Sequence, residues 1–478
     1  MLFNSFEFAL FLPIVFILYW FVTNKNLKLQ NLLIVIASYI FYGWWDWRFL
    51  SLIVFSSIID YSVGLGLKSQ QNNAKRKLLL ICSILVNIGF LGFFKYYNFF
   101  VDSFVDAFSF FGQTISSSSL NIILPVGISF YTFQTLSYSI DVYRRKLEPT
   151  KNIIAFFAFV SFFPQLVAGP IERATNLLPQ FYKERKFDYD NAIDGMRQIL
   201  WGLFKKIVIA DNCALWANRI FDGSADYSGS TLFLGVIFFA FQIYGDFSGY
   251  SDIAIGTSRL FGFNLMRNFA FPYFSRDIAE FWRRWHISLS TWFRDYVYIP
   301  LGGSKVGNIA KVRNTFIIFV VSGFWHGANW TFIVWGFINA LYFLPLLLFK
   351  KNRINTDQVA ENKLLPSFKE FLQMGTTFFI TLIAWVFFRA ENIQHAFSYL
   401  AGIFSKSLFS MPERHPKDVI ILLVLFVVVE WIQRDKQHAL QIDTIKIPRF
   451  LRWSLYYGII MVIHLMGGTQ QEFIYFQF

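Results

Sequence analysis

Charged residues are scarce in this chain. Only 15% of its 478 residues are Asp, Glu, Lys or Arg, whereas 55% are hydrophobic and the mean hydropathy is +0.45. This balance excludes an ordinary soluble protein and is typical of a chain that crosses a membrane several times. Because the apolar segments follow one another almost without a break, we expect a single all-α membrane domain over residues 1–478.

Cysteine and histidine are scarce as well. The two cysteines, Cys82 and Cys213, each stand alone in an apolar or amphipathic segment, which excludes a disulfide framework. The chain has six histidines, and no two of them share a short helical spacing. Zinc needs at least three nearby ligands, so we predict no metal site. A Gly-x-Ser-x-Gly sequence is also missing, which argues against a serine nucleophile elbow.

Basic residues outnumber acidic ones, and the formal net charge is +13. They form short clusters between apolar runs, as the cytoplasmic loops of membrane proteins do, so we predict no nucleic-acid partner. We interpret the pairs Lys205-Lys206 and Arg283-Arg284 as cytoplasmic anchors in preference to substrate clamps. Residues 6–22 follow no basic segment and precede no small-residue cleavage site, which favours a retained first span over a signal peptide.

The apolar segments predict about 11 to 13 helical pieces. Simple spans are expected at residues 27–42, 49–67, 78–94, 122–140, 371–388, 419–431 and 451–466. Residues 153–167 have basic flanks at both ends, which favours a re-entrant segment, with a plain transmembrane helix as the alternative. Two apolar arms at residues 231–244 and 251–263 meet at a glycine-rich joint, and residues 277–296 predict one amphipathic helix.

The chain is organised around residues 311–353. Basic residues lie at both ends of this segment, so we expect it to enter and leave the bilayer on the same side. Apolar arms at residues 315–324 and 331–349 flank the sequence GFWHGANW (residues 323–330), which is then the deepest point of the excursion. An ionisable residue at that depth is costly, so His326 is a functional candidate.

His326 and His286 differ from the other four histidines because aromatic residues and glycines surround them in the sequence. Two interpretations stay open for each. His326 is either a buried histidine that is hydrogen-bonded for structural reasons or a general base, which burial would keep neutral. His286 is either a helix-surface histidine at the membrane interface or a second group of the same site.

Four stretches carry a resemblance to known proteins. Residues 281–303 (FWRRWHISLSTWFRDYVYIPLGG) and 323–330 (GFWHGANW) each contain one of these two histidines. Residues 162–173 (FFPQLVAGPIER) and 246–252 (DFSGYSD) extend the match over most of the chain. Together they resemble the membrane-bound O-acyltransferase family. The pattern is most similar to its bacterial alginate O-acetylase branch, and the D-alanyl transferases of teichoic acids are more distant relatives.

The resemblance implies a ring of helices around a thin central wall, with a funnel on one side and a tunnel on the other. It places the catalytic core at about residues 120–350. His326 matches the family's near-invariant catalytic histidine, and His286 matches its second conserved position. We expect the substrate to contact Trp282, Trp325, Asn329 and Asp246.

The resemblance further implies acetyl transfer. Acetyl groups would pass from a cytoplasmic donor, acetyl-CoA, across the bacterial inner membrane to an extracytoplasmic polysaccharide such as an alginate-like exopolysaccharide. No permanently bound cofactor is expected. The partners would be a periplasmic SGNH-type acetyltransferase, proteins of polysaccharide synthesis and export, and membrane lipids.

The last residues, 472–478 (EFIYFQF), are aromatic and are predicted to lie outside the cell membrane. They resemble the tyrosine-bearing C-terminal motif of D-alanylation systems, which makes Tyr475 a candidate acyl relay activated by His326. Alternatively, the tail (residues 467–478) is an aromatic anchor at the membrane interface.

Other functions also stay open at this point. Peptidoglycan O-acetylation, D-alanylation and acyl transfer to a lipid or a protein are alternative reactions of the same fold. A transporter is the non-enzyme alternative, since polar groups embedded in a membrane can also mark a transport pathway. Transporters often have paired halves, however, and no internal repeat is visible in this sequence.

Overall fold

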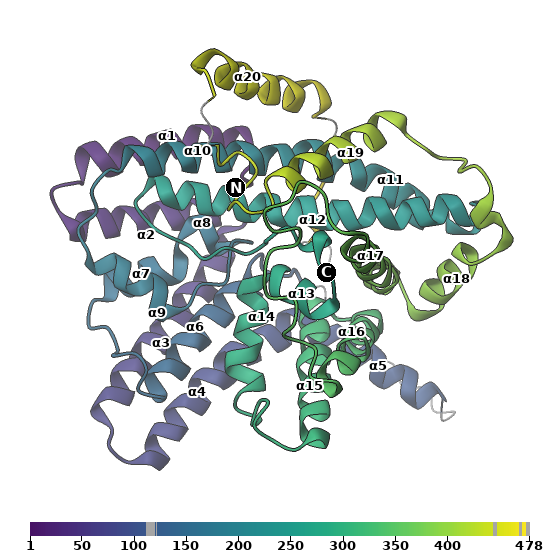
Figure 1. The fold of residues 1–478 in the computed structure, drawn as a ribbon. Helices are drawn as coiled ribbons and strands as arrows, with labels where there is room; N and C mark the ends of the chain where they lie inside the picture. Colours follow the sequence, from purple (N-terminus) through teal and green to yellow (C-terminus); the bar gives the residue numbers. More distant parts are fainter. Residues whose placement is uncertain (111–119, 121, 443–446, 468–470, 475–478) are drawn as a thin grey trace. The chain divides into compact units, whose positions relative to one another are not determined.

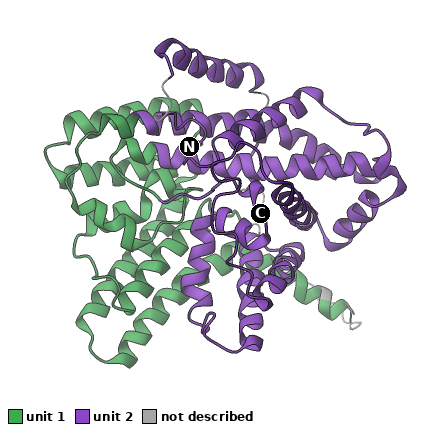
Figure 2. Cartoon of the chain, in the orientation of Figure 1, with its two compact units in different colours: residues 1–192, 257–265 green, residues 193–256, 266–478 purple. Residues whose placement is uncertain are grey.

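The computed structural model describes residues 1–110, 120, 122–442, 447–467 and 471–474 (Figure 1). All regular structure in these ranges is helical, which confirms the predicted all-α class. The chain divides into two compact units, residues 1–192 with 257–265 and residues 193–256 with 266–478 (Figure 2). That the whole chain acts as one functional domain stays a prediction.

The first unit contains nine complete helices within its described residues. They are α1 (Phe6–Ile17), α2 (Leu27–Gly43), α3 (Leu50–Ser69), α4 (Asn73–Leu91), α5 (Tyr97–Phe110), α6 (Ile128–Tyr143), α7 (Ile153–Ser161), α8 (Phe163–Leu166) and α9 (Ala174–Leu177). α7 and α8 are separated at Phe162, whose backbone leaves the helical region with φ −51° and ψ 104°. Residues 153–167 are therefore not one continuous helix, and their re-entrant path through the membrane stays a prediction.

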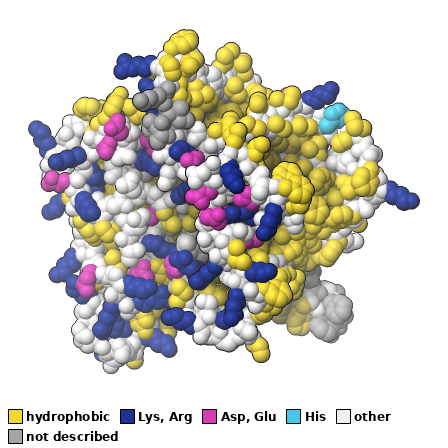
Figure 3. Space-filling model, viewed as in Figure 1, with side chains coloured by type: hydrophobic (Ala, Val, Ile, Leu, Met, Phe, Trp, Pro, Cys, Tyr) yellow, Lys and Arg dark blue, Asp and Glu magenta, His cyan; other side chains and the backbone are white. Residues whose placement is uncertain are grey.

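Several helices have the length and composition of membrane spans. Five of the described helices are long and apolar enough to cross a bilayer, at Trp47–Ser69, Asn73–Ser109, Gly229–Leu260, Trp330–Leu348 and Phe368–Arg389. Hydrophobic side chains are exposed over much of the face drawn in Figure 3. One row begins in α1 and includes Phe6, Leu10, Ile14, Ile17 and Phe21, each more than half exposed. Soluble monomers rarely expose such a stripe, so the chain is a multi-pass membrane protein.

The second unit holds the remaining helices. α10 (Tyr189–Leu203) continues into it from the first unit, and α12 (Gly229–Leu260) begins in it. The others are α11 (Asp211–Asp222), α13 (Ile278–Arg284), α14 (Ile287–Phe293), α15 (Asn308–His326), α16 (Trp330–Leu348), α17 (Phe368–Arg389), α18 (Ile393–Ile403), α19 (Lys417–Ile432) and α20 (Arg449–Met466). The two predicted arms of the central excursion are α15 and α16.

α12 corrects one expectation. The glycine-rich joint at residues 245–250 is not a break, because α12 runs through it as one helix of 32 residues. The glycines instead let another segment come close. A Cβ on Gly249 would lie 2.8 Å from the carbonyl oxygen of Gly202, and one on Gly245 would lie 3.0 Å from that of Lys205. Close backbone approach therefore explains these glycines.

Lys205 and Lys206 are buried, so their interpretation as cytoplasmic anchors is wrong. They lie in the π-helical turn Phe204–Ala210, which packs against α12. The Lys205 Nζ is 2.6 Å from the Asp252 Oδ2, and the Lys206 Nζ is 2.7 Å from the Asp246 Oδ1. Removing one partner of a buried ion pair costs about 3–5 kcal/mol, so these pairs fix the packing of the two segments.

α15 and α16 pack closely against each other at two glycines. A Cβ on Gly323 would overlap the carbonyl oxygen of Phe332, and one on Gly336 would overlap that of Phe319. Asn329 begins α16, because its side-chain oxygen accepts the backbone amide of Thr331 at 3.0 Å. The hairpin therefore holds the end of α15, where His326 lies, in a fixed position.

Gly323→Ala is expected to destabilise the protein. The added methyl group meets backbone, which cannot rotate away, and overpacking of this kind costs about 1–3 kcal/mol. Gly375→Ala in α17 is the matched control, since nothing lies within 4 Å of a Cβ at that position. Replacing a glycine in a helix interior with alanine stabilises by up to about 1 kcal/mol. The measurement is the midpoint temperature of thermal unfolding of the two variants in detergent. Equal midpoints for Gly323→Ala and Gly375→Ala would contradict the close packing of α15 and α16.

Candidate active site

His326 is the last residue of α15 and is buried, with 4% of its surface exposed. Three aromatic rings enclose the imidazole. The ring centroids of Trp325, Trp335 and Phe388 lie 4.8, 5.2 and 5.2 Å from that of His326. The predicted site residue Asn329 points elsewhere, since its Nδ2 donates to the carbonyl oxygen of Glu391 at 2.8 Å. The structure thus surrounds His326 with apolar side chains.

His286 lies at a break that the sequence pattern did not predict. The expected amphipathic helix over residues 277–296 is two short helices, α13 and α14, interrupted at Trp285 and His286. His286 has the left-handed backbone conformation, with φ +43° and ψ +56°. This conformation is uncommon outside glycine and costs about 1–3 kcal/mol, which the surrounding structure must supply.

A neighbouring segment holds this break in place. The backbone amide of Ala270 donates to the carbonyl oxygen of Arg284 at 2.9 Å, and the amide of Ile287 donates to that of Asn268 at 2.8 Å. These bonds replace the helical hydrogen bonds that would otherwise continue α13. Apolar periodicity cannot reveal them, because they connect residues 14 to 19 positions apart in the sequence.

The imidazole of His286 is fully enclosed, with 1% of the residue exposed. Its Nδ1 lies 3.2 Å from the Asn268 Oδ1, and the centroid of its ring lies 4.5 Å from that of Phe247. Burial in these surroundings lowers the pKa of His286 to about 3, so the ring is neutral near neutral pH. Trp325 lies between the two predicted histidines, with its ring 6.2 Å from His286 and 4.8 Å from His326.

A cavity of about 460 Å³ is lined by residues close in sequence to both histidines, although neither histidine is itself part of the lining. It is lined mainly by α13 to α16 and the loops around them: Ala279, Trp282, Arg283, Ile287, Ser290, Thr291, Phe293, Arg294, Tyr298, Ser304, Thr315, Ile318, Phe319, Ser322, Phe343, Leu347, Asn352 and Arg353. Ser322 is four residues, or about one helical turn, before His326 on α15. The predicted site residue Trp282 also lines it and lies 5.7 Å from Trp335, which touches His326.

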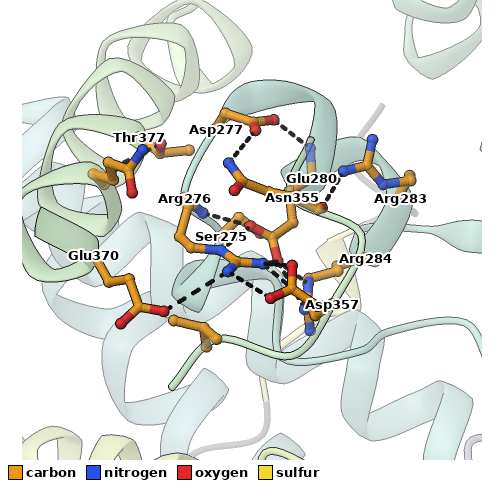
Figure 4. Close-up of polar contacts among 12 residues, drawn as sticks. Ser275, Arg276, Asp277, Glu280, Arg283, Arg284, Asn355, Asp357, Glu370 and Thr377 are labelled. Carbon is orange, nitrogen blue, oxygen red and sulfur yellow. Dashed lines mark hydrogen bonds and ion pairs between the residues drawn. The ribbon is translucent and has the colours of Figure 1, made fainter. Parts of the chain in front are cut away.

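Ion pairs fix the loop that forms one side of this cavity (Figure 4). The guanidinium of Arg276 binds the buried Glu280 at 3.1 Å and Asp357 at 3.0 Å. The hydrogen bond from Arg276 also lowers the pKa of the Asp357 carboxyl. Arg283 donates to the carbonyl oxygens of Asn352 and Asn355 at 2.9 and 2.5 Å. The loop after α16 is therefore tied to α13.

Arg283 and Arg284 do not behave alike, which corrects their joint interpretation as anchors. Arg284 Nη2 pairs with the buried Glu280 at 2.8 Å, so it is part of the fixed ion-pair network. Arg283 lines the cavity. Arg294 and Arg353 also line it, and the sequence marked Arg353 only as part of a basic flank.

Asp246 holds the C-terminal tail in this structure. Its Oδ2 accepts the backbone amide of Ile474 at 2.7 Å, while its Oδ1 pairs with Lys206. The Phe473 ring lies 5.0 Å from Tyr250, and both Phe473 and Ile474 are buried. Tyr475, the proposed relay, lies outside the described residues.

Sequence reasoning missed three groups of this site. Asn268 contacts His286, Lys206 pairs with Asp246, and Arg276 ties the cavity loop. Their partners are 18, 40 and 81 residues away, and none belongs to a recognisable local pattern. Among the described residues, no group of three or more His, Cys, Asp or Glu side chains is placed to hold a metal ion.

Two buried histidines and an arginine-bearing cavity, in a chain of apolar helices, fit a membrane-embedded transferase. The comparisons with known proteins are more specific. The model of the membrane-bound O-acyltransferase family matches residues 146–385, a range that includes His286, His326 and every residue that lines the cavity. The chain belongs to this family and is an O-acyltransferase, which confirms the resemblance seen in the sequence.

Curated relatives agree with this assignment. The chain is 40% identical over 435 residues to a probable alginate O-acetylase AlgI of Pseudomonas syringae pv. tomato, covering 90% of this chain and 80% of the relative. It is 40% identical over 416 residues to a probable AlgI of Pseudomonas aeruginosa, covering 86% and 76%. It is also 36% identical over 433 residues to a peptidoglycan O-acetyltransferase of Helicobacter pylori, covering 84% and 80%.

Proposed function

We propose that this protein transfers acetyl groups from acetyl-CoA, across the bacterial inner membrane, for O-acetylation of an extracytoplasmic polysaccharide. Relatives named as alginate O-acetylases support acetyl as the acyl group and an alginate-like polymer as the acceptor. A relative named as a peptidoglycan O-acetyltransferase keeps peptidoglycan as the second candidate acceptor. The observation that carries the proposal is the cavity whose lining residue Trp282 contacts Trp335, a ring that encloses His326.

The cavity has the size and chemistry that a thioester donor needs. Its volume of about 460 Å³ is typical of small-molecule sites. Arg283, Arg294 and Arg353 lie along its lining, and arginine is well suited to the phosphates of CoA. Trp282, which also lines the cavity, lies close to the aromatic wall around His326, and Ser322 is one helical turn before His326. A donor bound with its phosphates at the arginines would direct its acetyl group towards this wall.

Changes to the cavity are expected to weaken donor binding. A hydrogen bond between charged groups contributes about 1.5–3 kcal/mol, so Arg353→Glu should raise the KM for acetyl-CoA about tenfold or more. Ser322→Trp should fill the cavity and reduce kcat/KM further. Arg414→Glu, in the exposed loop before α19, is the matched charge-reversal control. Steady-state assays of CoA release measure these constants, and an unchanged KM in both cavity variants would exclude this donor route.

His326 is assigned the role of general base. It accepts the proton of the acceptor hydroxyl while the hydroxyl oxygen attacks the thioester carbonyl carbon. The C–O ester bond forms, the C–S bond breaks, and the imidazolium returns the proton to the sulfur of CoA. His286 supports the same site from the other side of Trp325.

The tail is assigned the role of acyl relay through Tyr475. The tyrosine hydroxyl would take the acetyl group as an ester and pass it to the final acceptor. The described part of the tail supports this role, because Phe473 lies 6.2 Å from Phe247, whose ring contacts His286. Asp246 and Lys206 would then act on the tail and not directly on the polysaccharide.

The partners follow from the proposed direction of transfer. An acetyl ester formed at the outer face needs a second enzyme to reach a polymer, and we assign this step to a periplasmic SGNH-type acetyltransferase that acts with proteins of polysaccharide synthesis and export. Mass spectrometry of digested polymers, from cells with and without the gene, tests the acceptor. Loss of O-acetyl groups from an exopolysaccharide is expected. Loss of O-acetyl groups from peptidoglycan would instead identify peptidoglycan as the acceptor, and loss of D-alanyl esters would identify the reaction as D-alanylation.

A further inference from the structure

Asn268 is completely buried in the loop between α12 and α13. Its side chain contacts His286, and its backbone carbonyl oxygen binds the next residue, Ile287. Its Oδ1 accepts from the backbone amide and the hydroxyl of Ser288, at 3.2 and 2.9 Å, and lies 3.2 Å from the His286 Nδ1. Its Nδ2 donates to the Ser251 Oγ at 3.0 Å. Its carbonyl oxygen accepts the Ile287 amide. The side chain therefore has one orientation.

These bonds determine where the hydrogen of the imidazole lies. A backbone N–H only donates, so the Asn268 atom that faces the Ser288 amide is the amide oxygen. The Ser288 hydroxyl also lies 3.4 Å from Nδ1, but it donates its hydrogen to the nearer Asn268 Oδ1 at 2.9 Å. An amide oxygen only accepts, so the hydrogen between Asn268 and His286 belongs to Nδ1. A neutral imidazole carries one hydrogen, which leaves Nε2 with a free lone pair. Within the described part of the chain, Nε2 is buried and makes no hydrogen bond.

We propose that Asn268 is a positioning residue for acyl transfer: it fixes His286 as the Nδ1–H tautomer and presents the Nε2 lone pair to the reacting groups. The inference rests on the proposed role of His286 in the site. Asn268 acts only through His286. The same residue supports the left-handed backbone of His286, because its carbonyl oxygen binds the Ile287 amide on one side of the strained position.

The surroundings of His286 make its response to charge predictable. The elements packed against the ring present Phe247 from α12, Phe269 from the loop and Trp325 from α15, none of which titrates. Burial is the cause of its low pKa, and no neighbouring charge opposes it. A carboxylate at position 268 would be the single charge in contact with the ring, so it would favour the imidazolium and raise the pKa of His286.

Two substitutions of Asn268 separate its role as a hydrogen-bond acceptor for His286 from its role in packing. Asn268→Leu has a similar volume but no acceptor, so we expect kcat to fall about 100-fold with an unchanged KM for the donor. Asn268→Asp keeps an acceptor for Nδ1–H and should recover most of the activity at high pH. Because its carboxylate raises the pKa of His286, this variant should lose activity as the pH falls, at a pH where the wild type is still active.

Nitrogen NMR of protein labelled with ¹⁵N-histidine reads the tautomer directly, and His286→Asn identifies the His286 signals. We expect a protonated Nδ1 and a bare Nε2 in the wild type and in Asn268→Asp, and a different pattern in Asn268→Leu. Ser288→Ala tests the second neighbour of the imidazole, because the Ser288 hydroxyl lies 2.9 Å from the Asn268 Oδ1 and 3.4 Å from the His286 Nδ1. It keeps the acceptor on Asn268, so we expect the wild-type tautomer in this variant.

The two readouts distinguish the possible failures. An Asn268→Leu protein that keeps the wild-type spectrum, or that keeps the wild-type kcat per folded molecule while its yield drops, would overturn the inference. If Asn268→Leu changes the spectrum but acetyl transfer continues unchanged in both it and His286→Asn, the proposed role of His286 fails, and with it any catalytic importance of Asn268.

Discussion

Cells that carry His326→Ala are expected to lose O-acetylation of the extracellular polymer. General-base catalysis contributes about 10²- to 10⁴-fold to a reaction rate, so acetyl content should fall at least about 100-fold. The loss arises because the variant lacks the imidazole that is proposed to accept the proton of the attacking hydroxyl. Acetyl esters are measured after mild alkaline release from purified polymer, normalised to the amount of protein in the membrane.

His415→Gln is the matched control. His415 lies in the exposed loop before α19, where its Nδ1 is 2.8 Å from the carbonyl oxygen of Pro412. Acetylation should be unchanged in this variant. His326→Gln complements the alanine variant, because it keeps much of the volume in the aromatic enclosure while removing the base. If both His326 variants fold and acetylate the polymer at the wild-type level, the chemistry lies elsewhere and the transporter alternative gains support.

Tyr475→Phe is expected to abolish transfer to the polymer without affecting folding. The change removes one hydroxyl group from the tail and nothing that Asp246 binds, since Asp246 holds the backbone amide of Ile474. If the tyrosine hydroxyl is the relay, no acetyl group can leave the site through the tail. Mass spectrometry should detect an acetylated C-terminal peptide in the wild type supplied with donor and no acceptor, and none in the variant.

Tyr457→Phe in α20 serves as the control for this prediction. Tyr457 is 64% exposed, so the loss of its hydroxyl should leave acetylation unchanged. Normal polymer acetylation in Tyr475→Phe would remove the relay and leave the tail as an aromatic anchor. It would not affect the assignment of His326, because direct transfer to a partner enzyme uses the same base.

The sequence predicted the parts of this fold that depend on local patterns. The span expected at residues 371–388 is α17, and the apolar run at residues 27–42 is the shorter helix α2, because a long apolar run needs no distant partner to be recognised. The two arms around His326 were predicted for the same reason. The family was recognised from the two histidine blocks, which are contiguous in the sequence.

The remaining features depend on contacts between distant residues. The helix predicted over residues 277–296 breaks at His286 because Asn268 binds the backbone on the far side of the break. Lys206 looked like a membrane anchor because its acidic partner Asp246 is on another helix. Periodicity describes one segment at a time, so it predicts neither the break nor the ion pair.

Vesicles that contain the purified protein test directly whether the acetyl group crosses the membrane and whether this transfer needs His326. Radiolabelled acetyl-CoA is supplied only on the side where the cavity arginines, Arg283 and Arg353, are accessible to a membrane-impermeant reagent. We expect donor-dependent CoA release on that side, and labelled ester in the opposite compartment when acceptor and partner are present there. His326→Ala should give neither product. Label that stays on the donor side, or equal transfer by His326→Ala, would contradict it.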